Sequence, residues 1–250
     1  MSTHLVVRDL AVSFNGFMAV SGLDLTVSKG ELRCLIGPNG AGKTTCLDLI
    51  CGKVKPTAGS ILFNGKHLET LEEYTIARFG VGRKFQVPSV FRELTVRQNL
   101  EVAYCKSPGV WANLLRAPQN DDTAGLEDLC AFVGLIDRME APAAHLSHGQ
   151  TQWLEIALLM AQNAELILMD EPTAGMTVQE TRKTAEIFNR LKGRHTLIVV
   201  EHDMGFVKEI GDSISVMHQG KLLAEGSVSE VESNPLVRSA YLGSGGFDHA

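Results

Sequence analysis

The stretch GPNGAGKT, Gly37 to Thr44, constrains the fold of this chain more than any other feature. It matches the phosphate-binding pattern G-x-x-x-x-G-K-[ST] without a gap. The apolar run ELRCLI before it is typical of a short buried strand, and TCLDLICG after it indicates a helix that Gly52 ends. Strand, glycine loop and helix together predict an anion site, because the loop N–H groups and the helix N-terminus would face the same phosphate.

Each residue type in this loop has a chemical reason to be there. Glycines let the backbone turn and approach a phosphate closely. We expect Lys43 to reach the β- and γ-phosphates of a nucleotide and the Thr44 hydroxyl to bind Mg²⁺. The candidate nucleotide-binding residues of the loop and the helix start are Gly37, Pro38, Asn39, Gly40, Ala41, Gly42, Lys43, Thr44 and Thr45.

The segment LILMDEP is an apolar run that ends in two acids, Asp170 and Glu171. Such a run predicts a buried strand, and α/β sheets place their ligands at the carboxyl ends of strands. Asp170 is therefore a candidate for holding Mg²⁺, as a Walker B aspartate does. Glu171 follows directly and could polarise the attacking water as a general base. An acid pair after a strand is weak evidence alone, but the phosphate loop earlier in the chain makes it specific.

The segment LSHGQ, Leu146 to Gln150, is the second strong signal. Ser147 and Gly149 at the start of a helix would form another anion site. The plainer interpretation is a capped helix, because Ser147 and Gln150 have the spacing of a capping box. Both interpretations can hold together. A second phosphate-binding helix end makes sense if each nucleotide site is built from two chains.

Strand-like and helix-like segments alternate along the chain, which favours an α/β core. The first 30 residues read as strands, and Asn64-Gly65 and Gln219-Gly220 have the composition of hairpin turns. From about Pro88 to Ala144, apolar residues follow helical spacing and β-branched runs are scarce. This helical insert between two sheet-forming parts predicts a subdomain.

Composition and charge exclude several classes of protein. The formal net charge is −6, which argues against nucleic acid as a partner, since that needs a basic face. The five cysteines have no C-x-x-C spacing and are expected to be inert thiols. We expect no signal peptide, because the N-terminus lacks an apolar core. No stretch reaches about 18 apolar residues, so no membrane-spanning segment is expected.

These motifs, with Gln86 and VVEHD, resemble the ATP-binding subunit of an ABC transporter. The order and spacing agree over about residues 4 to 242, and LSHGQ is similar to the family signature LSGGQ. The resemblance implies an α/β P-loop ATPase domain with an antiparallel β part. It implies one domain over 4–242 and a helical subdomain over 87–145. The C-terminal residues 243–250 are expected to form a flexible tail. ATP and Mg²⁺ are the implied cofactors.

The resemblance also assigns roles to single residues. Phe14 would stack on adenine, although packing in the strand core is a close alternative. Gln86 would sense Mg²⁺, so the implied metal ligands are Thr44, Gln86 and Asp170. His202 would contact the γ-phosphate, for which an imidazole is suited because it can donate a hydrogen bond or move a proton. The signature residues implied to bind ATP are Ser147, His148, Gly149 and Gln150.

Members of the family form head-to-tail dimers with two ATP molecules between a phosphate loop and the opposing signature. The implied partners are membrane-spanning permease subunits, a second ATPase subunit or a second copy of this chain, and indirectly a substrate-binding protein. The implied location is the cytoplasmic face of the membrane, as a peripheral subunit. Segments such as VGRKFQVPSVFRELTVRQNL are similar to the urea-importer subfamily of the UrtD type, which is itself similar to branched-chain amino-acid importer ATPases of the LivG type. Urea is the expected cargo, a branched-chain amino acid is the alternative, and a soluble non-transport ABC ATPase is a third hypothesis.

Two positions depart from the general family pattern. His148 stands where the signature usually has glycine, and we hypothesise that its imidazole tunes ATP affinity with pH. Thr177 stands where the family usually has an aspartate that communicates across the dimer. Trp111, Leu114 and Leu115 form either a solvated loop or a contact with a membrane subunit. The remaining histidines show no ligand spacing and are expected at the surface: His4, His67, His145, His195, His218 and His249.

Overall fold

The structure is a computed structural model that describes residues 2–84, 90–104 and 120–242. The predictions for Gln86, Cys105, Trp111, Leu114, Leu115 and the tail 243–250 lie outside these residues. The chain divides into two compact units. The first comprises Met1–Arg83, Glu165–Pro172 and Phe188–Ala250, and the second comprises Lys84–Ala164 and Thr173–Ile187. The expected domain bounds, 4–242 and 87–145, remain predictions.

An antiparallel four-stranded sheet opens the first unit, in the order β2-β1-β4-β5. Its strands are β1 (Thr3–Phe14), β2 (Phe17–Ser28), β4 (Ala58–Phe63) and β5 (Lys66–His67). Asn64 and Gly65 join β4 to β5 with φ angles of 47° and 76°. Two successive residues with positive φ form the type I′ turn that suits a two-residue hairpin. The antiparallel β part and this hairpin are therefore as predicted.

A six-stranded sheet follows, in the order β10-β9-β3-β8-β7-β6. Its strands are β3 (Leu32–Ile36), β6 (Val81–Arg83), β7 (Leu166–Asp170), β8 (Thr196–Val200), β9 (Ser213–His218) and β10 (Lys221–Gly226). All neighbours are parallel except β9 and β10, which turn at Gln219-Gly220 as predicted. Every residue of β3, β7 and β8 is buried, because parallel sheets are covered on both faces.

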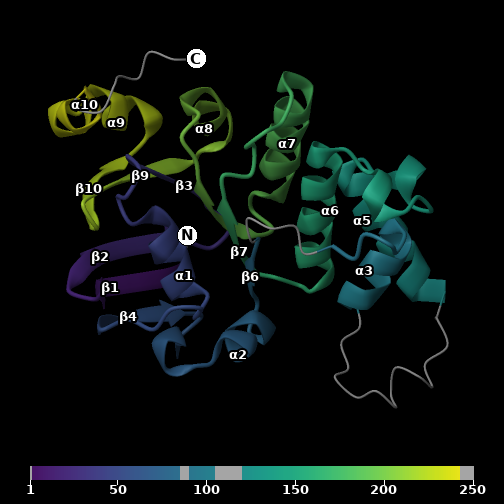
Figure 1. Ribbon diagram of the computed structural model, residues 1–250, viewed down its shortest axis with the longest axis horizontal. Coiled ribbons are helices and arrows are strands. Elements are labelled where there is room, and N and C mark those ends of the chain that lie inside the picture. The colour runs from purple at the N-terminus through teal and green to yellow at the C-terminus, as the bar shows by residue number, and fades with distance from the viewer. Residues whose placement is uncertain (1, 85–89, 105–119, 243–250) are drawn as a thin grey trace. The chain divides into compact units, whose positions relative to one another are not determined.

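Helix α1 (Lys43–Ile50) shares one hydrophobic core with both sheets (Figure 1). Its buried Leu47 and Ile50 belong to the same cluster as Leu5 of the antiparallel sheet and Leu35 of the parallel sheet. Gly52 follows the end of this helix at φ 79°. That left-handed conformation is the usual helix terminator, so the predicted stop is confirmed.

Helix α8 (Met204–Ile210) lies over the opposite face of the parallel sheet from α1. Side chains alternate between the two faces along a strand, so the neighbours Cys34 and Leu35 of β3 point to opposite faces. Leu35 belongs to the core that α1 shares. Cys34 faces α8, because a Cβ added to Gly211 after this helix would lie 3.2 Å from its sulfur. Phe206 of α8 also meets Phe188 of α7 (Val178–Leu191), with ring centroids 5.8 Å apart. The sequence patterns did not predict α8, nor the short helices α2 (Glu73–Arg78), α9 (Val228–Ser233) and α10 (Pro235–Leu242).

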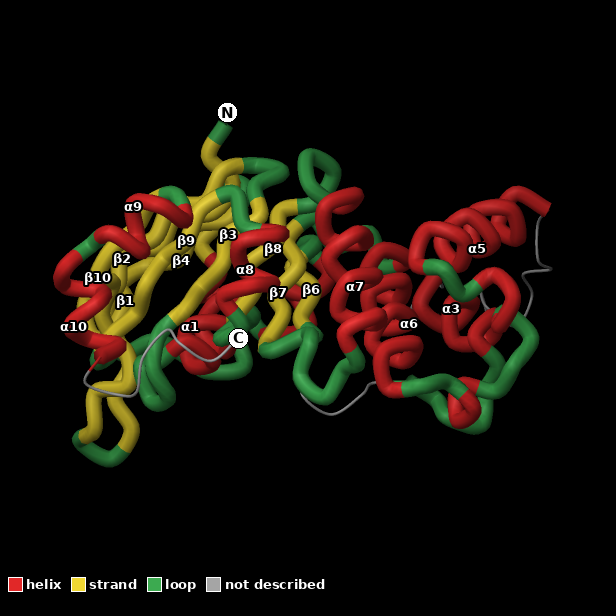
Figure 2. The backbone as a smooth tube through the Cα atoms, turned by 90° about the horizontal axis from the view of Figure 1, so that it is seen from above, coloured by secondary structure: helices red, strands yellow, loops and turns green. Residues whose placement is uncertain are grey.

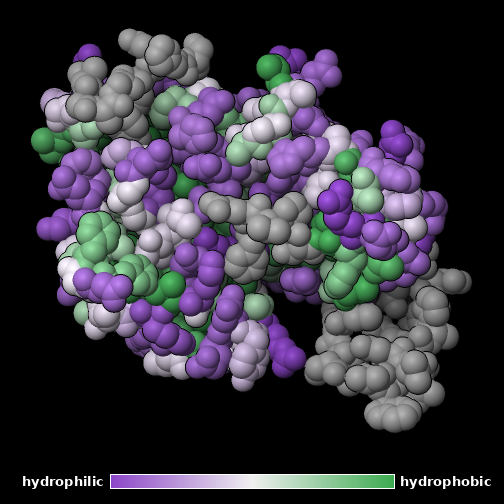
Figure 3. Space-filling model, viewed as in Figure 1, coloured by the Kyte–Doolittle hydropathy of each residue, from purple (hydrophilic) through white to green (hydrophobic). Residues whose placement is uncertain are grey.

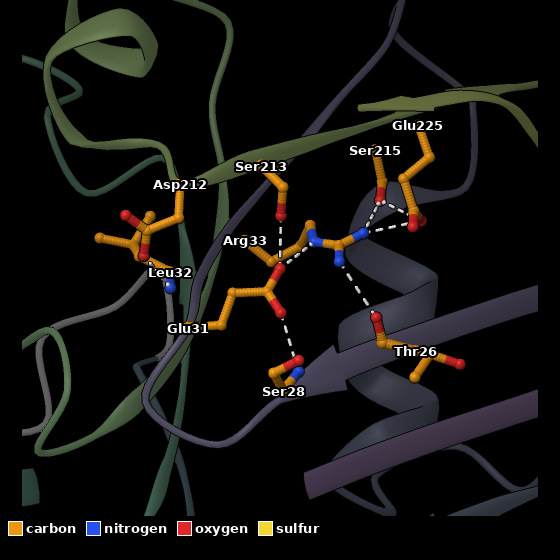
Figure 4. Close-up of polar contacts among 9 residues, drawn as sticks. All are labelled: Thr26, Ser28, Glu31, Leu32, Arg33, Asp212, Ser213, Ser215 and Glu225. Carbon is orange, nitrogen blue, oxygen red and sulfur yellow. Dashed lines mark hydrogen bonds and ion pairs between the residues drawn. The ribbon is translucent and has the colours of Figure 1, made fainter. Parts of the chain in front are cut away.

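A buried arginine connects the two sheets (Figure 4). Arg33 on β3 donates to Thr26 O on β2 at 3.0 Å and to Ser215 Oγ on β9 at 2.8 Å. Its guanidinium forms ion pairs of 2.7 Å with Glu31 and with Glu225 on β10. A buried charge is tolerated only when it is paired and hydrogen-bonded, so this cluster fixes how four strands meet.

In the second unit, the described residues form only helices (red) and loops (green) in Figure 2. Its helices are α3 (Val96–Tyr104), α5 (Asn120–Val133), α6 (His148–Ala161) and most of α7. The indole of Trp153 on α6 donates to Thr184 Oγ1 on α7 at 3.0 Å. Trp153 is therefore a packing residue that connects two helices, and the predicted helix-rich character of this region is confirmed for 90–104 and 120–133.

The prediction that His4 lies at the surface was wrong. Its side chain is only 2% exposed, and its Nδ1 lies 2.6 Å from Thr196 Oγ1. Its Nε2 faces Glu165 at 3.5 Å. The strand pattern did not indicate this burial, because a single polar residue in an apolar strand usually faces solvent. Cys34, Cys46, Cys51 and Cys130 are buried free thiols, and burial raises the pKa of each, as expected for inert cysteines.

The surface on the face drawn in Figure 3 is mostly hydrophilic, with hydrophobic side chains in a few separate patches. One patch lies at the left edge, over the antiparallel sheet. Phe14, Phe17 and Met18, which flank the Asn15-Gly16 turn between β1 and β2, are 44%, 67% and 45% exposed. Exposed aromatic groups on a hairpin tip are available to a ligand.

Candidate functional site

Three neighbouring strands of the parallel sheet end at the same edge and carry the candidate residues. β3 leads into the phosphate loop, and β8 leads into Glu201 and His202. β7 ends with Asp170 and is followed by Glu171. Because β3, β8 and β7 are adjacent and parallel, their carboxyl ends lie side by side. This is the place where open α/β sheets bind ligands.

Two positions of the phosphate loop require glycine, because at each of them the loop backbone lies against a different strand. Gly37 has φ 152°, and a Cβ there would lie 2.2 Å from Met217 O on β9. Gly42, the N-cap of α1, has φ 96°, and a Cβ there would lie 2.5 Å from Ala19 O on β2. Both sheets therefore press against the loop backbone, and this contact fixes the loop where its N–H groups can face an anion.

Lys43 is 9% exposed, and its ammonium lies at the centre of the loop. Nζ donates to Gly37 O at 2.6 Å and to Pro38 O at 3.1 Å. Burial lowers the pKa of Lys43, while the negative charges of Glu171 and Asp170 act in the opposite direction. The lysine therefore lies within electrostatic reach of both acids after β7, as the sequence motifs predicted.

Asp170 is 4% exposed at the end of β7. Burial raises the pKa of its carboxyl, although a hydrogen bond from Thr44 and the charge of Arg83 lower it. Its Oδ2 has no hydrogen-bond partner among the described residues and lies 3.8 Å from the Arg83 guanidinium. A buried carboxylate oxygen without a hydrogen bond, next to a threonine hydroxyl, fits the hard oxygen ligands that Mg²⁺ prefers.

Glu171 has a left-handed backbone with φ 46°, which is uncommon for a residue with a side chain. Its N–H donates to Val200 O on β8 at 2.9 Å, which holds this conformation. The side chain is 43% exposed, so its carboxylate can meet water and a ligand. Backbone strain of this kind is concentrated at functional sites.

His202 approaches Glu171 from the neighbouring strand. Its Nδ1 lies 3.8 Å from Glu171 Oε1, and its side chain is 67% exposed. The His202 N–H donates to the buried carboxylate of Glu201 at 3.1 Å. Asp203 then caps α8 by accepting from Gly205 N at 2.8 Å and Phe206 N at 3.1 Å. The sequence VVEHD thus anchors the backbone on both sides of the histidine and leaves its ring exposed.

The signature residues belong to the second unit. The Ser147 hydroxyl accepts from Gln150 N at 3.2 Å, and Gln150 Oε1 accepts from Ser147 N at 3.0 Å. The predicted capping box at the start of α6 is therefore confirmed. His148 is exposed, and its Nε2 lies 2.9 Å from Ala174 O in the TAGMT segment. Thr177 caps α7 by accepting from Glu180 N at 3.3 Å.

Sequence reasoning missed three residues beside these motifs. Arg83, buried at the end of β6, lies 2.8 Å from Asp48 of α1 and connects it to Asp170. Phe17 pairs with Phe14 across the hairpin and is the more exposed of the two. Glu180 contacts the signature, and the T-x-x-E spacing from Thr177 to Glu180 was a signal that could have found it.

Comparison with known proteins agrees with this geometry. The family model described as "ABC transporter" matches residues 20–174. The chain belongs to the ABC transporter family. As an ATP-binding cassette it is an ATPase that hydrolyses ATP to power transport. A second model, "Branched-chain amino acid ATP-binding cassette transporter", matches residues 221–246.

The relatives and solved structures cover nearly the whole chain. The chain is 39% identical to the high-affinity branched-chain amino acid transport ATP-binding protein LivG of Salmonella typhimurium (strain LT2), over 96% of this chain and 97% of the relative. It is 36% identical to BraF of Pseudomonas aeruginosa (strain PAO1), with the same coverage. The ADP conformation of the ATP-binding cassette MJ1267 superposes with a TM-score of 0.85 at 28% identity, over 97% of this chain and 100% of that one. The predicted ABC-type α/β fold is thus confirmed.

In the described parts of the chain, we find no helix of sufficient length and apolarity to cross a bilayer.

Proposed function

We propose that this ABC ATPase is the motor subunit of an importer for branched-chain amino acids. The single observation that carries its catalytic part is the convergence of Lys43, Asp170, Glu171 and His202 at one edge of the parallel sheet. These groups supply what phosphoryl transfer to water needs: a cation for the phosphates, a metal ligand, a base, and a donor toward the γ-phosphate.

In the proposed reaction, the loop N–H groups and Lys43 bind the β- and γ-phosphates of ATP. Thr44 and Asp170, together with Gln86, would hold Mg²⁺, which neutralises developing charge on the phosphate oxygens. The Glu171 carboxylate accepts a proton from the attacking water. The imidazole of His202 donates a hydrogen bond to a γ-phosphate oxygen, and its Nδ1 lies 3.8 Å from Glu171 Oε1, close enough for both groups to contact the same phosphate and water.

The second half of each site would come from another chain. Ser147, His148, Gly149 and Gln150 lie at the N-terminus of α6, where backbone N–H groups and the Ser147 hydroxyl are donors of the kind that binds anions. In a head-to-tail dimer they would meet the γ-phosphate on the opposing phosphate loop, and Phe14 would stack on adenine. The dimer partner is a second ATPase subunit or another copy of this chain.

ATP-driven closing and reopening of this dimer would shift the conformational equilibrium of membrane-spanning permease subunits. These subunits would receive the cargo from a substrate-binding protein. The ATPase would then act at the cytoplasmic face of the membrane as a peripheral subunit.

The cargo class is supported by the relatives. LivG and BraF are named for branched-chain amino acid transport, and the C-terminal residues 221–246 match the model of that transporter type. The urea cargo expected from the sequence resemblance finds no support among these relatives. A transport assay distinguishes the two cargoes.

Uptake of labelled leucine and labelled urea tests the proposal in cells that lack this gene. The cells are restored with wild type, Glu171→Gln, or Glu186→Gln, which removes an exposed charge from α7 and serves as the control. We expect leucine uptake to return with wild type and Glu186→Gln but not with Glu171→Gln. Restored urea uptake with unchanged leucine uptake would overturn the cargo, and restoration of neither would overturn the transport role.

A further inference from the structure

A carboxylate of the same chain occupies the N-terminus of the signature helix. Glu180 Oε1 accepts from the Ser147 hydroxyl at 2.7 Å and from Gly149 N at 3.2 Å. The contact is close, because a Cβ added to Gly149 would lie 2.6 Å from this carboxyl group. All three residues belong to the second unit, so one compact part of the molecule holds the arrangement.

The other oxygen of the same carboxylate has different partners. Glu180 Oε2 accepts from Thr177 N and from Thr177 Oγ1, both at 3.0 Å. Glu180 therefore connects the start of α7 to the signature through two separate oxygens. Hydrogen bonds from Ser147 and Thr177 lower the pKa of Glu180 to about 2, so this side chain is an anion throughout the physiological pH range.

The donors that Glu180 uses are the donors that the proposed function assigns to ATP. Ser147 Oγ–H and Gly149 N–H would bind the γ-phosphate of the partner subunit's nucleotide. A carboxylate oxygen and a phosphate oxygen cannot accept the same two hydrogen bonds at once. They would also repel each other at this distance, since both are negative.

We propose that Glu180 is an internal competitor of ATP: its carboxylate fills the anion site of the signature in the separate subunit and gives way to the partner's γ-phosphate when the dimer closes. This inference rests on the proposed function, which places the signature against the partner's nucleotide. Only the Oε1 contacts must break, because the Oε2 contacts with Thr177 do not involve the phosphate donors.

The competitor acts only on the triphosphate state. The γ-phosphate carries more negative charge than a single carboxylate and offers more acceptor oxygens, so it can replace Glu180 at both donors. ADP has no γ-phosphate to present there, and Glu180 keeps its contacts. Glu180 thus lowers the stability of the ATP dimer, where it must be displaced, and has no such effect in the ADP state.

The test uses the full chain in the Glu171→Gln background, where ATP persists and the closed dimer accumulates. Dimer dissociation constants are measured by sedimentation with ATP and with ADP for three additional changes: Glu180→Gln, Glu180→Asp and the control Glu186→Gln. Glu180→Asp keeps the charge near Thr177 but shortens the side chain away from Ser147. A melting curve for each variant reports its folding.

We expect Glu180→Gln to lower the dissociation constant of the ATP dimer at least about tenfold relative to Glu186→Gln. In this variant a charged carboxylate no longer competes with the γ-phosphate for the hydrogen bonds of Ser147 and Gly149. Glu180→Asp should change the dissociation constant in the same direction. Equal dissociation constants for the Glu180 variants and the control, or weaker dimers at unchanged melting temperature, would overturn the inference.

A fourth variant separates this inference from the proposed function. Ser147→Ala in the same background should abolish the ATP-dependent dimer if the signature binds the partner's nucleotide. If Glu171→Gln alone forms no dimer with ATP, the pairing of two copies of this chain across the nucleotide fails, and the inference fails with it. If that dimer forms and depends on Ser147 while the Glu180 variants match the control, only the inference fails.

Discussion

His202 Nδ1 and Glu171 Oε1 lie 3.8 Å apart, although the two residues follow different strands of the parallel sheet. The distance is too long for a hydrogen bond, so each side chain keeps its own polar group available. Both groups can therefore form hydrogen bonds with the same reacting phosphate and its attacking water. The exposed imidazole and the strained glutamate backbone are the clearest signs of a site built for chemistry rather than stability.

Replacing His202 tests its role in the chemical step. We expect His202→Ala to reduce the ATP hydrolysis rate about 100-fold or more, as loss of a positioned donor or proton carrier does. ATP affinity should change little, because Lys43 and the loop remain. Steady-state hydrolysis and nucleotide binding check this, with the exposed His145→Ala as the matched control. A hydrolysis rate equal to that control would remove His202 from the mechanism.

Substitutions at Gly37 and Gly40 distinguish the effect of backbone strain from that of steric crowding in the phosphate loop. Both glycines have positive φ, at 152° and 78°, so alanine is strained at either position. Only at Gly37 does an added Cβ meet backbone, because Gly40 has no atom within 4 Å among the described residues. We expect Gly40→Ala to cost about 1–2 kcal/mol and Gly37→Ala clearly more. Thermal unfolding measures both, and equal losses would contradict the crowding.

Local motifs made much of this site predictable from sequence. The phosphate loop, the acids after β7 and the capping box at Ser147 each lie within a few consecutive residues, so their spacing fixes their geometry. The type I′ turns at Asn64-Gly65 and Gln219-Gly220 were predictable for the same reason. His202 was predicted from family resemblance, because the residues next to it in the sequence do not form a motif that indicates a chemical role.

Contacts between distant segments could not be predicted. Arg83 reaches Asp48 and Asp170 from a three-residue strand whose sequence gives no sign of burial. His4 is buried because β1 lies against Thr196, 192 positions away. Residues of this kind depend on how strands are ordered in a sheet, which periodicity does not encode.

The cluster around Arg33 predicts an acid sensitivity. Burial alone would raise the pKa of Glu31, but hydrogen bonds from Arg33, Ser213 and Ser28 lower it below 4.5. A carboxyl whose pKa is lowered by folding stabilises the protein above its unfolded pKa, and this contribution is lost as pH falls through the folded value. Wild type should therefore lose part of its free energy of unfolding below about pH 4.5.

Arg33→Ala should cost about 3–5 kcal/mol at pH 7, because Glu31 and Glu225 lose their buried partner. The variant should also lose less stability between pH 7 and pH 4 than wild type does. Urea unfolding at both pH values measures this, with the exposed Arg238→Ala as control. An unchanged free energy of unfolding in Arg33→Ala would show that the cluster contributes nothing.

His148 is the residue where pH should act on ATP binding. Its ring is exposed, lies 2.9 Å from Ala174 O through Nε2, and follows a serine assigned to the partner's phosphate. An imidazolium beside a phosphate binds it more tightly than a neutral ring does, and histidine is the side chain that changes charge near neutral pH. We expect wild type to bind ATP more tightly at pH 6 than at pH 8, and His148→Gly to lose this difference. Identical pH profiles for the two proteins would exclude the role.

The most direct test of the account compares ATP hydrolysis by wild type and Glu171→Gln in the presence of Mg²⁺, with Glu186→Gln as the charge-matched control. We predict that wild type and the control turn over ATP at the same rate. Glu171→Gln should still bind ATP but hydrolyse it at least about 100-fold more slowly, because the amide cannot accept the proton of the attacking water. Hydrolysis by Glu171→Gln at the wild-type rate would contradict the catalytic assignment.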